Sequence, residues 1–476
     1  MTSCPIRGKR MYKPWNKQQE QLTGIYHSED LELQQSRYNA LIERFTTWQG
    51  KGDYLIARAP GRVNIIGEHT DYNHCPVLPC AVDRDIIAVF TPRTDGKIIV
   101  ADFIEKYGER EFQITGDLPP FPSGNWGNYI KAAIQGLHSE GVLDLNDKET
   151  KGYSMMMHST IPAAAGMSSS SAMVVLSAIV ALHVNDKEVA PLDLAEMMAR
   201  AERYTGTQGG GMDQAAILLG HKGSALKIDF APLKCETTPF PEDYQILIAH
   251  STIEAPKTKE IMDKYNRRSI ECRLAAGVIS SYELQKGRKS IAYLGELTPD
   301  YPFAQALKDE GYSKLQLQEI LSLEEEELNS KYCQRKDGTI FPEPEGGFLL
   351  FKRAFHVISE WKRVEESAQM LREGKIKELG ELMYASHESC RDNHEISCRE
   401  LDLLVECGKG LGSPGCRLTG AGFGGCTVHI SHENELDSYI DGLKNCFYKG
   451  NLGLSDARDY LFSVYPSEGA QILKKL

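Results

Sequence analysis

The chain has 476 residues, about three times the length of a common ~150-residue domain, so two sizeable domains are expected. Its 41% hydrophobic and 25% charged residues are ordinary for a globular protein and exclude a disordered, collagen-like or coiled-coil chain. The 54 basic and 66 acidic residues give a net charge of −12, with the acidic excess spread along the chain, which argues against a nucleic-acid partner because phosphate binding needs a basic surface.

No segment has the composition of a membrane span or of a secretory signal. The longest apolar run, 173–184, contains Ser177 and His183 and is shorter than the ~18 residues that a span needs. The first twenty residues are basic, but no apolar stretch follows them. The 12 cysteines show no CxxC pair and no regular spacing, which favours reduced thiols over a disulfide framework. We therefore expect a cytoplasmic protein with no membrane partner.

The first part of the chain predicts an α/β domain behind a polar N-terminal extension. Residues 1–50 are polar, and apolar residues at helical spacing predict a helix from Leu31 to Trp48. Beyond this extension, the pattern predicts strands at Tyr54–Arg58, Ile87–Thr91 and Lys97–Asp102 and a helix at Trp126–His138.

The second part contains a charged, irregular stretch between regular elements. Residues 286–345 include the Pro/Gly-rich sequence FPEPEGG at 341–347, which predicts an insertion or a short helical subdomain. Amphipathic helices are expected near 350–372 and 375–390, followed by mixed helix and strand. The whole chain therefore predicts an α/β protein.

Polar groups crowd the segment ARAPGRVNIIGEHTDYNHCPVLPCAVDRD at 57–85. Pro60 and Gly61 predict a turn between two β-like runs. The side chains that follow it are Arg62, Glu68, His69, Asp71 and Tyr72. Such donors and acceptors at fixed positions suit a polyhydroxylated ligand. The alternative is a solvated turn with ordinary surface charges.

A serine run opens a strongly apolar helix in IPAAAGMSSSSAMVVLSAIVAL at 161–182. Serines at a helix start cap it, and the same position offers unpaired backbone N–H groups and the positive end of the helix dipole to an anion. Both capping and a phosphate site are compatible with this pattern. The chain has no GxxxxGK[ST], so a nucleotide loop here is not of the Walker type.

Two further segments are rich in glycine. In AERYTGTQGGGMDQAAILLG at 201–220, Asp213 follows three glycines at the expected start of a helix. There it can act either as a helix cap or as a base that points into a cleft. In RLTGAGFGGCTVHI at 417–430, three glycines match GxGxxG, but that fingerprint must open a helix, whereas Cys426–Ile430 is strand-like. We therefore predict a glycine-rich turn between two strands.

A set of potential zinc ligands lies further along the chain. His387, Cys390, His394 and Cys398 fall at spacings of one helix face. We expect no metal there, because the polar residues after Arg391 indicate that the helix ends.

The order of PGRVNIIGEHTDY, PAAAGMSSSSA, GGGMDQ and LTGAGFGGC closely resembles galactokinases, members of the GHMP small-molecule kinase family. The resemblance runs from about Asp53 to the C-terminus and includes SHESCRDNHEISCRELDLL at 386–404. It implies a two-lobed α/β (α+β) GHMP kinase fold, with the active site in the cleft between an N-terminal domain at 51–235 and a C-terminal domain at 236–476 that carries the insertion 286–345. We expect a monomer.

The resemblance implies a role for each matching residue. Arg62 and Asp213 would be the catalytic pair. The sugar would be held by Arg62, Glu68, His69, Asp71, Gly210, Asp213 and Tyr265. ATP would be bound by Trp126 near the adenine and by the phosphate loop of Gly166, Met167, Ser168, Ser169, Ser170 and Ser171. Ser169 and Glu202 would contact Mg²⁺.

These roles imply an ATP-dependent kinase that phosphorylates the C1 hydroxyl of galactose to give α-D-galactose 1-phosphate. An N-acetylgalactosamine kinase and a sugar sensor that controls a regulatory partner are alternatives. The complete phosphate loop Gly166–Ser171, called the serine loop below, favours an enzyme. Tyr265 matches the tyrosine of galactokinases, and this resemblance implies a preference for galactose, because a hydroxyl near C2 of the sugar can bond the 2-hydroxyl and would crowd an acetamido group. The sequences SSSSA and GTQGGGMDQ resemble the N-acetylgalactosamine kinase instead. Two stretches depart from the family pattern, Ala163–Ala165 and His74–Pro76, and the second bears on sugar specificity.

Overall fold

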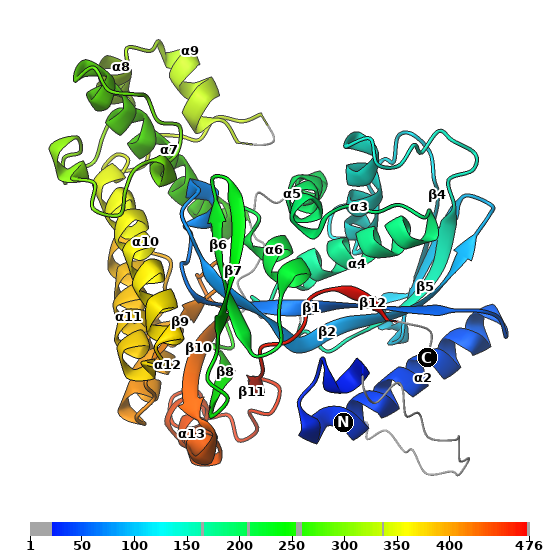
Figure 1. Cartoon of the computed structure of the whole chain (residues 1–476). Helices are drawn as coiled ribbons and strands as arrows, with labels where there is room; N and C mark the ends of the chain where they lie inside the picture. Colours follow the sequence, from blue (N-terminus) through cyan, green and yellow to red (C-terminus); the bar gives the residue numbers. More distant parts are fainter. Residues whose placement is uncertain (1–20, 163–165, 207–209, 254–258, 336–337, 474–476) are drawn as a thin grey trace.

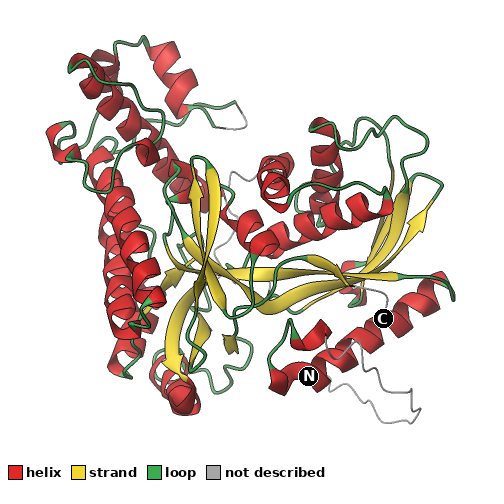
Figure 2. Ribbon diagram, in the orientation of Figure 1, coloured by secondary structure: helices red, strands yellow, loops and turns green. Residues whose placement is uncertain are grey.

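The computed structural model describes residues 21–162, 166–206, 210–253, 259–335 and 338–473. The first twenty residues of the predicted extension, and Ala163–Ala165, lie outside these ranges. The first sheet has six strands in the order β12–β1–β2–β5–β3–β4, the second has four in the order β11–β8–β10–β9, and β6 pairs with β7 (Figure 2). The strand bounds are β1 Leu55–Ile66, β2 Leu78–Arg93, β3 Lys97–Asp102, β4 Glu109–Gln113, β5 Gly152–Ser159, β6 Ser224–Phe230, β7 Leu233–Pro239, β8 Tyr244–His250, β9 Cys416–Thr419, β10 Cys426–His432, β11 Leu461–Val464 and β12 Gln471–Leu473.

Helices cover both faces of the first sheet. On one face α4 and α6 contact β1 and β2, and α3 and α5 pack on these helices; α2 lies against the opposite face (Figure 1). The bounds are α2 Leu31–Gln49, α3 Gly127–Ser139, α4 Ser169–Val184, α5 Pro191–Ala201 and α6 Met212–Leu219. Arg37 of α2 forms a buried 2.6 Å ion pair with Asp85 of β2. The helical part of the extension is therefore packed into the first sheet.

A second group of helices surrounds the second sheet. α11, α12 and α13 contact its strands, and α10 packs between α11 and α7. Residues 286–345 contain α8 and α9, which join α7 in a separate hydrophobic core around Leu317, Leu328 and Phe348. The bounds are α7 Lys259–Gln285, α8 Lys314–Leu321, α9 Glu325–Leu328, α10 Leu350–Arg372, α11 Ile376–Ser389, α12 Arg399–Gly410 and α13 Leu436–Leu443.

The mixed α/β fold and most predicted elements are confirmed, and one predicted turn is wrong. The helices predicted at 31–48, 126–138 and 350–372 correspond to α2, α3 and α10. No turn interrupts the chain at Pro60–Gly61, because β1 continues through both residues to Ile66. The pairing of β1 with β2 shifts register between Pro60 and Arg62. Such a bulge tolerates a proline, which cannot donate a ladder hydrogen bond, and keeps the strand continuous.

The expectation of reduced thiols throughout is wrong for one pair of cysteines. Cys407 of α12 and Cys446, in the π-helical segment Lys444–Lys449, form a disulfide. The two residues are 39 positions apart and meet only because their segments share one hydrophobic core, a proximity that cysteine spacing does not reveal. In the part of the chain that the structure describes, no helix is long and apolar enough to cross a membrane.

Candidate active site

Arg62 connects β1 to the loop that precedes α4. Its backbone N–H donates to the Met167 carbonyl oxygen at 3.2 Å, and its guanidinium donates to the Gly166 carbonyl oxygen. Gly61 permits this approach, because a Cβ atom there would lie 3.1 Å from the Met167 oxygen and 3.2 Å from the Arg84 oxygen. Arg62 is only 5% exposed. Its positive charge is therefore held in a fixed place beside the loop.

Asp213 lies in the first turn of α6 and faces Arg62. Arg62 Nε donates to Asp213 Oδ1 at 2.7 Å, and the Ser168 hydroxyl donates to Asp213 Oδ2. Gly211 precedes the helix with a φ of 106°, a conformation that a side chain would strain. The Asp213 side chain is 28% exposed, so the carboxylate is oriented by two donors and still accessible. The structure thus brings together the two residues predicted as a catalytic pair.

The start of α4 presents unpaired backbone donors. Ser168 precedes the helix in a left-handed conformation, and its side chain makes no capping hydrogen bond. The Ala172 N–H donates to the Ser168 carbonyl oxygen, while the N–H groups of residues 169–171 have no partner among the described residues. These donors and the positive end of the 16-residue helix form a site suited to an anion. This geometry favours the phosphate interpretation over simple capping.

Glu202 supports the same loop from the segment that follows α5. Its Oε2 accepts a 2.8 Å hydrogen bond from the Ser171 hydroxyl and another from the Gln214 amide. Glu202 and Ser169 both offer oxygen donors, the type that Mg²⁺ prefers. A nucleotide-bound Mg²⁺ needs only one or two protein oxygens, so this donor set fits it. The described residues contain no cluster of three or more acidic, histidine or cysteine side chains suited to a metal bound by protein alone.

Glu68 is buried beyond the end of β1 and pairs with an arginine of the second sheet. Arg417 Nη1 of β9 lies 2.8 Å from Glu68 Oε2, and the two side chains are 0% and 2% exposed. Burial raises the pKa of Glu68, and the Arg417 charge opposes this rise. Arg417 also donates to the Asn64 carbonyl oxygen of β1. The pair therefore ties the end of β1 to the second sheet.

Asp71 joins the polar segment after β1, which comprises Glu68–Tyr72, to the start of α6. The Gly210 N–H donates to Asp71 Oδ2 at 2.9 Å, and a Cβ atom at Gly210 would lie 2.4 Å from the Asp71 carbonyl carbon, so only glycine fits. Burial, with the negative charge of Asp213, raises the pKa of Asp71 to about 6. Two carboxylates therefore lie close enough to influence each other.

Two aromatic rings complete this group. His69 has a φ of 60° and is buried, and burial lowers its pKa to about 3, so the imidazole is neutral. The ring of Tyr265 on α7 lies 5.1 Å from the His69 ring. Burial, followed by the charge of Asp71, raises the pKa of Tyr265, so its hydroxyl stays protonated. The predicted sugar residues thus lie together with Arg62 and Asp213.

Trp126 has partners of its own at the start of α3. Its indole N–H donates to the Tyr107 carbonyl oxygen at 3.1 Å, and the Arg110 guanidinium lies 5.4 Å from the ring centre. Among the described residues, no hydrogen bond joins Trp126 to the serine loop. Its role near the adenine stays a prediction.

The four residues considered as zinc ligands have other contacts. His387 Nε2 lies 3.1 Å from an Asp402 oxygen, and Cys398 precedes α12. Cys390 is buried beside Arg417, and His394 is buried at the end of the π-helical segment Cys390–His394. Sequence reasoning missed Arg417 and His394 as supports of the site. A charged residue at 417 inside an otherwise apolar strand is the signal that could have found the first.

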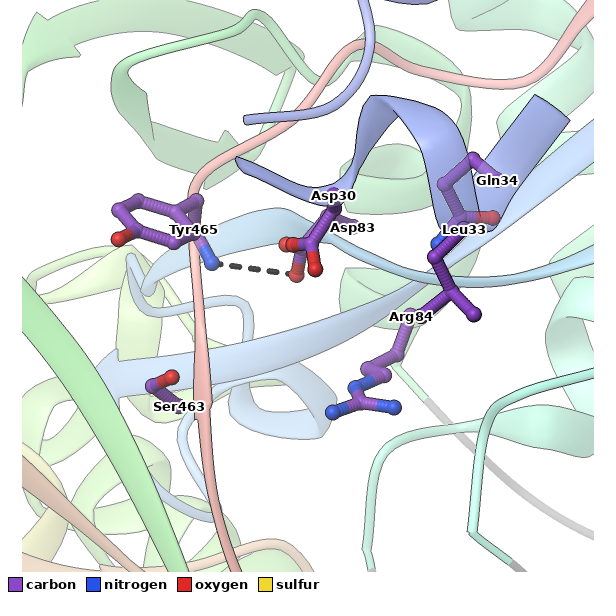
Figure 3. A pocket seen from close by; sticks show the side chains of 7 residues that line it. All are labelled: Asp30, Leu33, Gln34, Asp83, Arg84, Ser463 and Tyr465. Atoms are coloured by element: carbon purple, nitrogen blue, oxygen red, sulfur yellow. Dashed lines mark hydrogen bonds between the residues drawn. The ribbon is translucent and has the colours of Figure 1, made fainter. Parts of the chain in front are cut away.

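A separate polar cavity lies where α2, β2 and β11 meet (Figure 3). Its lining residues are Asp30, Leu33, Gln34, Asp83, Arg84, Ser463 and Tyr465. Asp83 Oδ1 accepts a 3.1 Å hydrogen bond from the Tyr465 N–H. Arg62, Asp213 and the serine loop are not part of this lining, so the cavity is not the candidate active site.

Three family descriptions match separate parts of the chain. The galactokinase galactose-binding signature matches residues 43–92, the GHMP kinases N terminal domain matches 128–221, and the GHMP kinases C terminal domain matches 367–449. The first covers Arg62 and the polar segment after β1, and the second covers the serine loop and Asp213. The matched regions therefore include the side chains that the structure brings together.

Whole-length similarity extends to several proteins. The galactokinase of Dictyostelium discoideum is 31% identical over 496 residues, covering 95% of this chain and 97% of that protein. The galactokinase of Fusobacterium nucleatum is 33% identical over 433 residues, covering 88% and 95%. The crystal structure of Lactococcus lactis galactokinase complexed with galactose superimposes with a TM-score of 0.72 at 27% identity, covering 92% of this chain and all of that one. The mevalonate kinase of Methanococcus jannaschii, at 16% identity and a TM-score of 0.56, shares the fold.

Proposed function

The chain belongs to the galactokinase family, and we propose that it transfers the γ-phosphoryl group of ATP to the C1 hydroxyl of galactose, giving α-D-galactose 1-phosphate. The observation that carries this proposal is the junction of Arg62, Asp213 and the serine loop beside the buried polar segment after β1. The relatives described above are named galactokinases, which supports galactose rather than N-acetylgalactosamine as the acceptor.

Asp213 is the proposed acceptor of the hydroxyl proton. Its carboxylate is oriented from one side by Arg62 and from the other by Ser168, which leaves it partly exposed to a substrate. A base within hydrogen-bond reach of the attacking hydroxyl is what phosphoryl transfer to an alcohol requires. Arg62 then stabilises negative charge that develops on the transferring group.

The serine loop is the proposed phosphate site. The N–H groups of residues 169–171 and the α4 dipole stabilise the phosphate oxygens. Ser169 and Glu202 would hold Mg²⁺, which neutralises charge on the phosphates when it is bound. Met167 and Gly166 accept hydrogen bonds from Arg62, so the loop and the catalytic arginine keep a fixed spacing.

The buried polar segment is the proposed galactose site. Glu68 and Asp71 supply acceptors, the protonated Tyr265 hydroxyl can exchange hydrogen bonds with sugar hydroxyls, and the neutral His69 ring lies beside Tyr265. Gly210 lets the start of α6 approach Asp71 closely enough to place Asp213 beside the same sugar.

The proposal extends to the arrangement of the whole protein. We assign the N-terminal domain to 51–235 and the C-terminal domain to 236–476, with the insertion at 286–345, although β12 of the last segment pairs with β1. We also propose a monomeric cytoplasmic protein whose partners are galactose and Mg·ATP.

One assay tests the reaction. ADP release from ATP is measured with a panel that contains galactose, N-acetylgalactosamine, glucose and no sugar, and the phosphorus NMR spectrum identifies the product. Galactose-dependent ADP release with a C1 phosphomonoester is expected. Turnover with N-acetylgalactosamine alone, or ADP release that no sugar stimulates, would overturn the proposal.

A further inference from the structure

A chain of partly buried hydrogen bonds runs from His394, which follows α11, to the polar segment after β1. His394 Nε2 lies 3.1 Å from the Tyr72 hydroxyl oxygen, and that oxygen lies 2.8 Å from His69 Nδ1. His69 Nε2 in turn lies 3.1 Å from the Ala421 carbonyl oxygen, in the glycine-rich turn between β9 and β10. These contacts join three separate stretches of sequence, 69–72, 394 and 421, at one point.

The direction of each bond follows from elementary hydrogen-bond chemistry. The Ala421 carbonyl can only accept, so His69 Nε2 carries the hydrogen. A neutral imidazole has one N–H, so His69 Nδ1 accepts, and the Tyr72 hydroxyl must donate to it. The Tyr72 oxygen is then free to accept, and His394 Nε2–H is its donor. Burial lowers the pKa values of His69 and His394, which keeps both rings neutral.

His394 makes this donation at a cost. It is fully buried, and its Nδ1 has no hydrogen-bond partner among the described residues. The ring of His356 lies 4.4 Å away, but its own nitrogens are engaged with the Ser389 hydroxyl and the Glu68 carbonyl oxygen. A phenylalanine would fill the same space without an unpaired buried acceptor. What the imidazole adds is therefore the Nε2–H bond to Tyr72.

We propose that His394 is a positioning residue for the sugar: by donating to the Tyr72 oxygen it turns the Tyr72 hydroxyl hydrogen toward His69 Nδ1 and so holds the orientation of the His69 ring. This inference rests on the proposed function, in which His69 lies against galactose. With its Nδ1 occupied by Tyr72 and its Nε2–H held by Ala421, His69 keeps one ring orientation before the sugar arrives. A preorganised site binds more tightly, because less freedom is lost on binding.

The expected effect is selective. His394→Phe removes the donor at similar volume and is expected to weaken galactose binding about 3- to 10-fold, the size of one neutral buried hydrogen bond. The KM for ATP is expected to change less than about 2-fold, because no hydrogen bond among the described residues joins the serine loop to His69, Tyr72 or His394. His394→Gln keeps an N–H donor in place of Nε2–H and is expected to recover most of the galactose affinity.

The experiment combines affinity with a spectroscopic readout on the full chain. The Kd for D-galactose is measured by calorimetry for the wild type, His394→Phe, His394→Gln, Tyr72→Phe and the double Phe variant. Proton–nitrogen spectra of histidine-labelled protein, with the His69 signal assigned from a His69→Gln variant, report which nitrogen carries the hydrogen. His429→Phe is the matched control, because His429 is also fully buried but bonds Thr427 and Tyr439 in the second sheet.

The outcomes separate this inference from the proposed function. An Nε2–H tautomer of His69 in the wild type, a changed His69 Nδ1 nitrogen shift in His394→Phe and in Tyr72→Phe, and a double variant no weaker than either single one would support it. An unchanged His69 Nδ1 nitrogen shift in His394→Phe, or a galactose Kd altered no more than in His429→Phe, would overturn it. Wild-type protein that binds galactose but releases no ADP would overturn the proposed function and leave this inference standing.

Discussion

Replacement of Asp213 by asparagine tests the chemistry at the centre of the site. Asparagine has nearly the same volume; its side-chain oxygen can still accept from Arg62, and its NH2 group, in the place of Oδ2, can donate to the Ser168 hydroxyl oxygen, so the geometry is expected to survive. The Arg62–Asp213 ion pair joins an arginine that is 7% exposed to a carboxylate that is 28% exposed, so loss of the Asp213 charge is expected to cost about 1–3 kcal/mol of stability. Loss of the proton acceptor is expected to lower kcat by roughly 10²–10⁴-fold, or about 2.7–5.5 kcal/mol of transition-state stabilisation.

The assay is ADP release at saturating galactose and Mg·ATP, with melting temperature and galactose affinity measured on the same samples. Asp186→Asn is the control, because the Asp186 side chain is 86% exposed, has Lys151 as its one ion-pair partner among the described residues, and has a left-handed backbone that asparagine tolerates. The control is expected to keep full activity. If Asp213→Asn retained kcat within about 3-fold of the wild type, the assignment of Asp213 as proton acceptor would be refuted.

Four further predictions concern single groups. Ser169→Ala is expected to raise the KM for Mg·ATP severalfold with little change for galactose, since it removes an oxygen donor at the start of α4; initial-rate titrations of both substrates measure this. The kcat/KM for galactose is expected to fall as pH drops through about 6. The pKa of Asp71 is raised to about 6, so below this pH its carboxyl group becomes protonated and stops acting as an acceptor for the sugar and for the Gly210 N–H. A flat profile of kcat/KM from about pH 5 to 7 would contradict this. Arg417→Gln is expected to lower the melting temperature and weaken galactose binding, because it leaves Glu68 buried without its counter-charge. The free energy of unfolding is expected to fall by about 3–5 kcal/mol. Thermal unfolding with and without galactose measures both effects. The kcat/KM of the wild type is expected to be roughly 10- to 100-fold higher for galactose than for N-acetylgalactosamine, and Tyr265→Phe is expected to reduce this ratio. Equal kcat/KM values for the two sugars in the wild type would exclude a role of Tyr265 in sugar selection.

Local periodicity was sufficient for the long helices and insufficient for β1. The spacing of apolar residues predicts α2 and α10 well, because a helix that packs on one side repeats its pattern every few residues. Pro60 and Gly61 favour a turn when only their neighbours are considered. The strand continues because its bulge accommodates Pro60, and because Gly61 lies against the carbonyl group of Met167, a residue more than a hundred positions later in the sequence.

The residues of the candidate site also divide into those that could be predicted from the sequence and those that could not. The pair of Arg62 and Asp213 could be proposed only through the resemblance, because β1 and α6 come together through the fold and not through spacing. Arg417 and His394 were missed because a polar residue in a sequence does not show whether it turns inward or what it meets there. The disulfide between Cys407 and Cys446 depends on the same kind of long-range packing.

The last described strand has a consequence for how the protein is made. β12 pairs with the outer edge of β1, through Ile56↔Leu473 and its neighbours, although nearly the whole chain separates them. On the ribosome, which adds ~5–20 residues per second, β1 can pair with β2 early but must wait on the order of tens of seconds for β12. During that interval the strand that carries Arg62 has an open edge, which is a template for pairing with other chains. The nascent protein is therefore expected to be prone to aggregation after β1 and β2 have paired and before β12 emerges.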